Sequence, residues 1–244
     1  MFKKIKGLLI DIDDTLVKFR SEMEARKNTG SLGNVIISAA GEFCNMPQEI
    51  AQRKFTAIEK RIKWWCWSDF LQELNIPEDA FWEYAYKIES RYLIPTEPNL
   101  KQKMLALKEM GLQLFITSNN PLSGIKHKLS LAGIPRLDID YIFEDIYGVA
   151  ELQNMKWDKQ YWNDVVSATQ IDIKNLAVVG DNFRDDCEIP ASIGIEMMFL
   201  IDNQNCYNFN NRNIKKINYI ADIVDYFRIL KKEQTKDYEL TCSL

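Results

Sequence analysis

Acidic side chains gather within four residues near the start of the chain, at Asp11, Asp13 and Asp14. They directly follow the apolar run 7–10 (Gly-Leu-Leu-Ile), which is typical of a short buried strand. Open α/β sheets place their ligands at the carboxyl ends of such strands. Carboxylates this close repel one another unless a cation or phosphate chemistry requires them. The pattern therefore indicates a hard metal ion and a phosphate group, although Asp-rich turns also follow ordinary strands.

A second apolar run, much later in the chain, also leads into acids. Residues 175–180 read Asn-Leu-Ala-Val-Val-Gly, and Asp181 follows directly, with Asp185 and Asp186 close behind. Glycine at position 180 permits a close backbone approach or an unusual dihedral angle just before the first acid. Two predicted strands therefore end in carboxylates, which favours a common site at one edge of a sheet.

A third apolar run, residues 112–116, ends in hydroxyl and amide side chains. Thr117, Ser118 and Asn119 are able to donate hydrogen bonds to phosphate oxygens, although Ser and Asn also favour plain turns. Lys156 lies between this run and the second one, just ahead of a helix-like stretch. Acids, hydroxyls, a lysine and acids again therefore occur in a fixed order.

In this order the segments resemble the motifs of the haloacid dehalogenase superfamily, whose members are mostly magnesium-dependent phosphatases. The first motif, Asp-x-Asp-x-Thr, is complete at Asp11, Asp13 and Thr15. The second motif is a hydrophobic strand closed by Ser or Thr and usually followed by Asn. It favours Ser118, with Thr117 as the other candidate.

The third and fourth motifs of this family are similar to two later segments. Lys156 corresponds to the lysine of the third motif, and Trp157 stands where proline is usual. The fourth motif resembles the segment that begins at Gly180, and its second acid occurs at either of two spacings. Asp185 and Asp186 therefore both stay candidates, and the resemblance says little about the inserted segment or the C-terminal tail.

Phosphomonoester hydrolysis needs a positioned nucleophile and groups that neutralise spreading negative charge. We interpret Asp11 as the nucleophile, which attacks phosphorus and forms an aspartyl-phosphate. Asp13, two residues on and on the same side of a strand, is the general acid–base candidate. Lys156 is expected to neutralise charge, and Ser118 to donate to a phosphate oxygen. The predicted phosphate-binding residues are Thr117, Ser118, Asn119 and Lys156.

Magnesium, the expected cofactor, prefers oxygen ligands and commonly binds one or two carboxylates together with a phosphate. We assign Asp11 and Asp181 as its carboxylate ligands, and the family resemblance implies the backbone carbonyl of Asp13 as a third. Asp185 and Asp186 complete the metal candidates, although Asp185 is equally suited to cap the helix that follows.

Composition excludes several classes of protein. The chain has 244 residues, a hydrophobic fraction of 46% and a net charge of −4, so no general basic field for nucleic acid is expected. No apolar run approaches the roughly 20 residues that span a membrane. The five cysteines show no paired metal spacing, and an odd count without a signal sequence favours reduced thiols in the cytoplasm. Oligomeric state is not indicated.

The spacing of the motifs predicts the domain organisation. The interval between Asp14 and residue 112 is far longer than one crossover helix needs, and helical spacings recur over 47–67 and 79–92. The resemblance implies an α/β core with a doubly wound, mostly parallel, Rossmann-like sheet and an inserted α-helical cap. The predicted boundaries are 1–17 and 96–244 for the core and 18–95 for the cap.

Three further segments carry expectations of their own. A strand is predicted at 141–143 and an amphipathic helix at 220–230. The inserted segment contains a cluster that is either a substrate wall or the packing of a small bundle, and packing is favoured. This cluster consists of Arg61, Lys63, Trp64, Trp65 and Trp67.

The sequence therefore predicts a magnesium-dependent phosphatase for a small phosphorylated metabolite, whose identity it does not indicate. The enzymatic alternative is a phosphomutase with the same nucleophile, and the other alternative is a non-catalytic phosphate-binding or regulatory protein. A dehalogenase is disfavoured, because Asp13 stands where halide-releasing relatives typically lack that acid.

Overall fold

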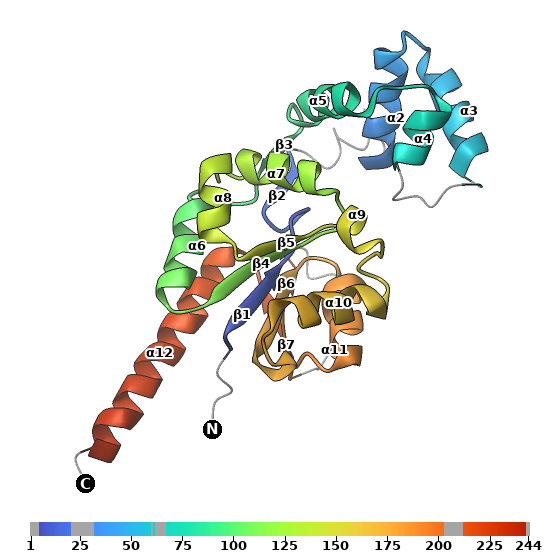
Figure 1. Cartoon of the computed structure of the whole chain (residues 1–244). Coiled ribbons are helices and arrows are strands. Elements are labelled where there is room, and N and C mark those ends of the chain that lie inside the picture. Colours follow the sequence, from blue (N-terminus) through green and yellow to red (C-terminus); the bar gives the residue numbers. More distant parts are fainter. Residues whose placement is uncertain (1–4, 21–31, 60, 62–66, 203–211, 243–244) are drawn as a thin grey trace. The chain divides into compact units, whose positions relative to one another are not determined.

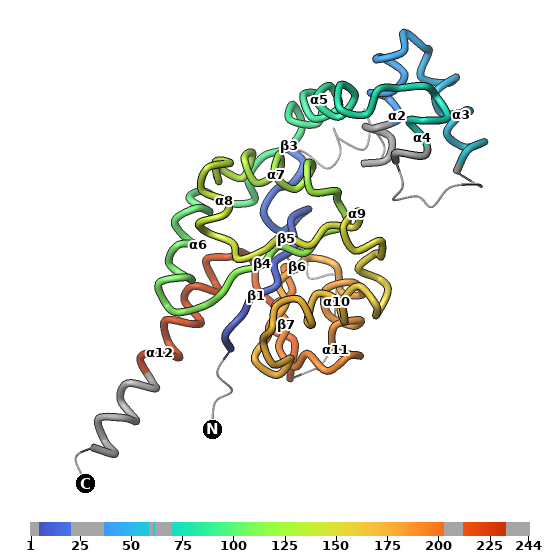
Figure 2. Tube along the Cα trace, viewed as in Figure 1, coloured from blue at the N-terminus to red at the C-terminus, as the bar shows by residue number. Residues whose placement is uncertain are grey.

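The computed structural model describes residues 5–20, 32–59, 61, 67–202 and 212–242 (Figure 1). The chain divides into two compact units, which are also seen in the Cα trace (Figure 2). We call Met1–Val17 with Pro95–Leu244 the core unit and Lys18–Ile94 the inserted unit. Within the cluster of the inserted segment, Lys63, Trp64 and Trp65 lie outside the described residues, as does the side chain of Trp67.

The core unit is built on a six-stranded sheet with the order β5-β4-β1-β6-β7-β8. Every neighbouring pair in this sheet is parallel. The predicted parallel, Rossmann-like α/β core is therefore confirmed. The strands are β1 (Gly7–Ile10), β4 (Gln113–Thr117), β5 (Asp145–Tyr147), β6 (Leu176–Gly180), β7 (Met197–Ile201) and β8 (Ile214–Ile217).

The three apolar runs of the sequence form the centre of this sheet. β1 and β6 are buried over their whole length, as expected for central strands of a parallel sheet covered on both faces. Ile10 at the end of β1 pairs with Ile116 of β4 and with Val179 of β6. The residues that follow these three strands therefore meet at the same edge of the sheet.

Helices cover both faces of the sheet (Figure 1). α6, α7, α8 and α12 lie on one face, while α10 and α11 lie on the other, where Tyr161 and Trp162 of α10 pack against Leu9 and Val178. Right-handed crossovers require this division, because the chain moves from β1 to β4 and β5 and then back to β6 and β7. The helices are α6 (Leu100–Glu109), α7 (Leu122–Leu131), α8 (Arg136–Ile142), α9 (Val149–Leu152), α10 (Lys159–Thr169), α11 (Ile189–Ile193) and α12 (Ile220–Cys242).

The strand predicted at 141–143 is wrong. Its first two residues end α8, which begins directly after Pro135, and the strand of this region is β5 at Asp145–Tyr147. Ile139 and Ile142 are buried three residues apart, so the apolar run serves one face of a helix rather than a strand. The helix predicted at 220–230 exists and extends further, to Cys242.

The inserted unit contains four helices among its described residues, and these pack around Phe70, Phe81 and Ile88. Arg61 pairs with Glu73 at 3.0 Å on the surface of this unit. Two short strands, β2 (Val17–Phe19) and β3 (Leu93–Pro95), form a sheet of their own where the chain leaves and re-enters the core unit. The helices are α2 (Leu32–Phe43), α3 (Gln48–Glu59), α4 (Trp67–Glu73) and α5 (Glu78–Glu89).

None of the described helices is both long enough and apolar enough to cross a bilayer.

Candidate active site

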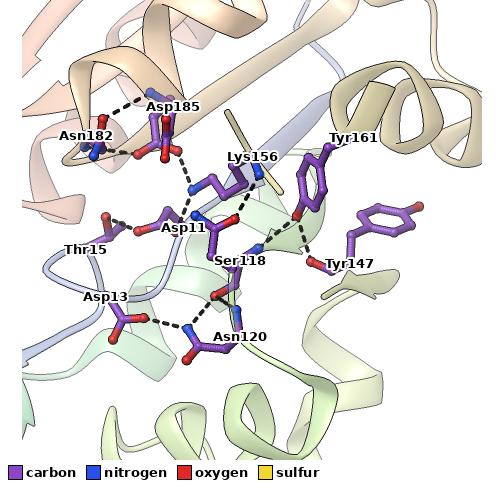
Figure 3. A network of polar contacts seen from close by, with 12 residues as sticks. Asp11, Asp13, Thr15, Ser118, Asn120, Tyr147, Lys156, Tyr161, Asn182 and Asp185 are labelled. Atoms are coloured by element: carbon purple, nitrogen blue, oxygen red, sulfur yellow. Dashed lines mark hydrogen bonds and ion pairs between the residues drawn. The ribbon is translucent and has the colours of Figure 1, made fainter. Parts of the chain in front are cut away.

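The carboxyl ends of β1, β4 and β6 bring together most of the polar residues selected from the sequence (Figure 3). Asp11 follows β1, Ser118 follows β4 and Asp181 follows β6. The Asp11 N–H donates to the carbonyl of Val179 at 2.9 Å, which continues the sheet pairing by one residue. Lys156 reaches the same place from the loop before α10. This edge is where parallel sheets bind their ligands.

Asp11 and Lys156 form a buried ion pair at the centre of this edge. The Lys156 Nζ lies 2.6 Å from Oδ1 of Asp11, and both residues are buried. The hydroxyl of Thr15 donates to the other oxygen, Oδ2, at 3.2 Å. The indole N–H of Trp162 donates to the Lys156 carbonyl at 2.7 Å and so fixes the backbone of the lysine. The Asp11 carboxylate is therefore held on both oxygens.

Asp186 is the second carboxylate that contacts Lys156, at 2.5 Å. Its Oδ2 accepts a hydrogen bond from the Asn182 N–H at 3.1 Å, so the side chain folds back over the end of β6. This approach requires a glycine at position 180, because a Cβ there would lie 2.2 Å from Cγ of Asp186. The π-helical turn η2 (Phe183–Glu188) carries Asp186 into this position.

Three carboxylates offer one oxygen each within 4.8 Å of one another: Asp11, Asp181 and Asp186. We call this set the acidic trio. The carboxylates of Asp13 and Asp185, both metal candidates from the sequence, do not belong to it. Asp185 hydrogen-bonds instead to the side chain of Asn119. The capping role considered for Asp185 belongs to Asn182, whose Oδ1 accepts from the Asp185 N–H at 3.1 Å.

Burial and mutual repulsion change the protonation of the acidic trio. Burial raises the pKa of Asp11 to about 7, and the Asp186 and Asp13 carboxylates add to this while Lys156 acts against it. Burial, followed by the charges of Asp11 and Asp186, raises the pKa of Asp181 to about 9. Burial also raises the pKa of Asp186. If all three were ionised, the trio would carry more negative charge than its surroundings balance, and the raised pKa values reflect this.

Lys156 responds in the opposite way to the same surroundings. Burial acts to lower the pKa of Lys156, but the charges of Asp11 and Asp186 outweigh it and raise the pKa above its ordinary value. The ammonium group therefore stays charged, and one buried cation faces three carboxylates. A second, divalent cation with oxygen ligands fits this donor set.

Asp13 lies two residues after Asp11, but its hydrogen-bond partners are different residues. Its Oδ2 accepts from Nδ2 of Asn120 at 2.6 Å, and its Oδ1 accepts from the ammonium of Lys128 at 2.7 Å. Lys128 also donates to Oδ1 of Asn120 at 2.9 Å, so these three side chains form a closed triangle. The Asp13 side chain is 28% exposed, whereas that of Lys128 is 1% exposed.

Lys128 was not predicted from the sequence. Lys128 lies on α7 beside the buried residues Gly124, Ile125 and Leu129, so a lysine on the apolar face of a helix was the available signal. No local pattern could have given its partner, because Lys128 and Asp13 are 115 residues apart in the chain.

The phosphate-binding candidates after β4 differ in their contacts. The Ser118 hydroxyl accepts from Asn120, at 3.1 Å from the backbone N–H and 2.7 Å from Nδ2. The Ser118 N–H donates to the Tyr147 carbonyl and to the Tyr161 hydroxyl, each at 3.0 Å (Figure 3). Thr117 is fully buried, and its hydroxyl has no hydrogen-bond partner among the described residues.

Asn119, the remaining phosphate-binding candidate, contacts both the loop that carries Lys156 and the turn η2. Its Oδ1 accepts from the Lys156 N–H at 2.9 Å, and its side chain also hydrogen-bonds to Asp185. In this structure Asn119 therefore ties the lysine loop to the end of β4 and to η2.

Comparison with known proteins gives a consistent result. A family model described as haloacid dehalogenase-like hydrolase matches residues 5–194. A comparison with curated proteins finds no match. Among solved structures, a HAD phosphatase from Thermococcus onnurineus is similar with a TM-score of 0.63 and 18% identity, over 91% of this chain and 97% of that chain.

Two other solved structures show how widely this fold is used. The magnesium-bound structure of YfnB from Bacillus subtilis has a TM-score of 0.58 and 16% identity, over 93% of this chain and 100% of that chain. The L-2-haloacid dehalogenase RSc1362 has a TM-score of 0.57 and 16% identity, over 92% of this chain and 99% of that chain. At these identities the similarity shows the fold alone.

Proposed function

The chain belongs to the haloacid dehalogenase-like hydrolase family, and on that premise we propose that it is a magnesium-dependent phosphatase for a small phosphorylated metabolite. One observation carries this proposal. The buried Asp11 carboxylate is paired with Lys156 at 2.6 Å, and a second, partly exposed acid stands two residues away at Asp13. A nucleophile and a separate proton carrier on one strand end suit hydrolysis through a covalent intermediate.

The proposed reaction has two steps that use the same two acids. In the first, the Asp11 carboxylate attacks phosphorus, the bond to the leaving oxygen breaks, and Asp13 gives that oxygen a proton. In the second, Asp13 takes a proton from water as the water oxygen attacks phosphorus, which releases phosphate and restores Asp11. Lys156 balances charge beside the nucleophile throughout.

The acidic trio fits a magnesium ion. Asp11 and Asp181 would hold it together with the backbone carbonyl of Asp13, because magnesium binds few protein carboxylates and keeps water or phosphate oxygens besides. Asp186 pairs with Lys156 and accepts from the Asn182 N–H, and we assign it to orienting the lysine and supporting the metal. When bound, the metal supplies positive charge for the phosphate oxygens.

The hydroxyl and amide groups after β4 are proposed to bind the phosphate. Ser118 keeps a hydroxyl hydrogen to donate while its oxygen accepts from Asn120, and Thr117 stays the other candidate. We further propose that the inserted unit is a helical cap that selects the substrate.

A cytoplasmic location stays a prediction, supported only by the cysteine count.

Release of phosphate from an aryl phosphate, with and without magnesium, tests the proposed function. We expect wild-type turnover that requires magnesium, and a loss of at least about a thousandfold in Asp11→Asn, because that variant lacks the attacking carboxylate. Asp225→Asn is the matched control, since Asp225 pairs with Arg228 on the surface of α12. Turnover of Asp11→Asn within tenfold of wild type would refute the assigned nucleophile.

The alternatives give different results in the same system. A phosphomutase would convert a sugar phosphate to an isomer, and a regulatory protein would bind magnesium and phosphate without turnover of a broad ester panel. A dehalogenase, an activity named for one of the structural neighbours, would release halide from a haloacid without needing Asp13.

A further inference from the structure

Lys128 is a buried lysine that the proposed phosphatase reaction leaves unused. Its side chain is 1% exposed and rises from α7 among Gly124, Ile125 and Leu129. Burial of an ammonium group is strongly unfavourable unless the charge is paired and hydrogen-bonded. The partners that pair with the buried ammonium group therefore indicate the role of Lys128.

Those contacts lead to the catalytic edge of the sheet. Lys128 donates to Asp13 at 2.7 Å and to Oδ1 of Asn120 at 2.9 Å, and Asn120 donates to the other Asp13 oxygen at 2.6 Å. The Asn120 carbonyl accepts from the Val149 N–H at 3.2 Å, which anchors the amide through its backbone. The triangle therefore holds Asp13 from two sides, by groups that are themselves fixed.

The contacts with Lys128 and Asn120 leave the Asp13 carboxylate able to bind a further partner. Each of its oxygens receives one donor, and a carboxylate has about four acceptor sites in all, so each oxygen keeps one for another partner. Asp13 is also the exposed member of the pair, at 28% against 1% for the lysine. The buried lysine therefore leaves part of the Asp13 side chain open to solvent.

We infer that Lys128 is a positioning residue for proton transfer by Asp13. The inference rests on the proposed function, in which Asp13 gives a proton to the leaving oxygen and then takes one from the attacking water. Because its side chain is 1% exposed, Lys128 acts through Asp13 and not on the substrate: it fixes the direction in which the Asp13 oxygens point. Geometry of this kind matters, because misplacement by about 1 Å costs on the order of a hundredfold in rate.

A purely structural ion pair is the competing explanation, and a double-mutant cycle separates the two. If Lys128 acts through Asp13, its replacement has no further effect on turnover once Asp13 is already Asn. If it only stabilises the fold, its effect is the same in both backgrounds. Lys128→Met is suitable, because methionine is unbranched, apolar and adapts to irregular buried sites.

The experiment measures kcat and KM for an aryl phosphate with magnesium in wild type, Lys128→Met, Asp13→Asn and the double variant. We expect Lys128→Met to lower kcat about 10- to 100-fold, with KM within about threefold of wild type. We expect the double variant to match Asp13→Asn within about twofold. Lys101→Met, which removes a partly exposed lysine of α6 paired with Asp138 of α8, is the control and keeps wild-type kcat.

Three outcomes would overturn the inference. If the wild type is active and Lys128→Met has the same kcat, the inference is overturned but the proposed function is not. The same holds if Lys128→Met lowers kcat by the same factor in the Asp13→Asn background as in the wild type. A wild type without turnover overturns the proposed function and the inference together. If Lys128→Met does not fold, Lys128→Gln carries the same cycle, because it removes the ammonium group from Asp13 while keeping a polar side chain at the buried position.

Discussion

Asp11 and Asp13 stand two residues apart at the end of one strand, and each contacts a buried lysine at almost the same distance. Lys156 lies 2.6 Å from Asp11, and Lys128 lies 2.7 Å from Asp13. The surroundings differ. Asp11 shares its lysine with Asp186 and forms the acidic trio with it and Asp181, whereas the second oxygen of Asp13 binds the amide of Asn120.

This difference separates the two roles. Around Asp11 the carboxylates outnumber the cations, so the site is incomplete in charge and suits a bound metal and a phosphate. Around Asp13 one lysine balances one carboxylate, and the side chain is partly exposed. That arrangement suits a group that exchanges protons with substrate and water. The same residue type thus takes two roles because of its neighbours.

Replacement of the Asp13 carboxylate tests its role as the group that carries the proton. We expect Asp13→Asn to lower turnover by about 10²- to 10⁴-fold, since that is the usual contribution of a positioned acid–base group. Breakdown of the phospho-enzyme slows for every substrate, because Asp13 no longer takes a proton from water, and its formation slows when the leaving group needs protonation. Rapid-quench single-turnover rates check this, and normal rates would assign the proton transfers to another group.

Replacement of the Asp181 carboxylate tests the role of the acidic trio in binding magnesium. We expect Asp181→Asn to weaken magnesium binding by more than about tenfold, because it removes one carboxylate of the acidic trio. Asp185→Asn is the matched control, since Asp185 is nearby but outside the trio. Calorimetric titration of magnesium measures both. Equal weakening in the two variants would show that the trio is the wrong ligand set.

A methyl group at position 180 tests how Asp186 is held. The added Cβ would lie 2.2 Å from Cγ of Asp186, so the carboxylate must move away from Lys156. We expect Gly180→Ala to lower the free energy of unfolding by about 1–3 kcal/mol, as overpacking of a buried site does. Urea unfolding measures it, and a change below about 0.5 kcal/mol would mean that the loop adapts without strain.

The crowded acids also predict how stability varies with pH when metal is absent. The pKa values of Asp11 and Asp181 in the folded state are about 7 and about 9, against an ordinary value of 3.8, so the fold is more stable while these buried acids are protonated. Their contribution is complete below pH 3.8 and is lost as pH rises through about 7 and about 9. Lys156 stays charged throughout.

Unfolding of the metal-free protein at pH 6 and pH 9 measures this effect. We expect lower stability at the higher pH, and we expect magnesium to restore more stability there than at pH 6. Equal or greater stability of the metal-free protein at pH 9 would contradict the crowding of the acidic trio.

The sequence predicts the sheet because its central strands are short apolar runs, and parallel strands place their carboxyl ends together. It fails at 141–143, because an apolar triplet suits the buried face of a helix as well as a strand. It also could not choose between Asp185 and Asp186, since the π-helical turn and its contact with Gly180 decide which of them faces Lys156. Lys128 reaches Asp13 only through the fold.

Direct detection of the covalent intermediate tests the division of roles between Asp11 and Asp13. Asp13→Asn is mixed with a nitrophenyl phosphate, whose leaving group needs little protonation, then quenched in acid and digested for mass spectrometry. We expect phosphate to accumulate on the peptide that contains Asp11, and not to accumulate in wild type or in the variant that also has Asp11→Asn. Nitrophenolate release without phosphorylated Asp11, or phosphate on another residue, would contradict the account.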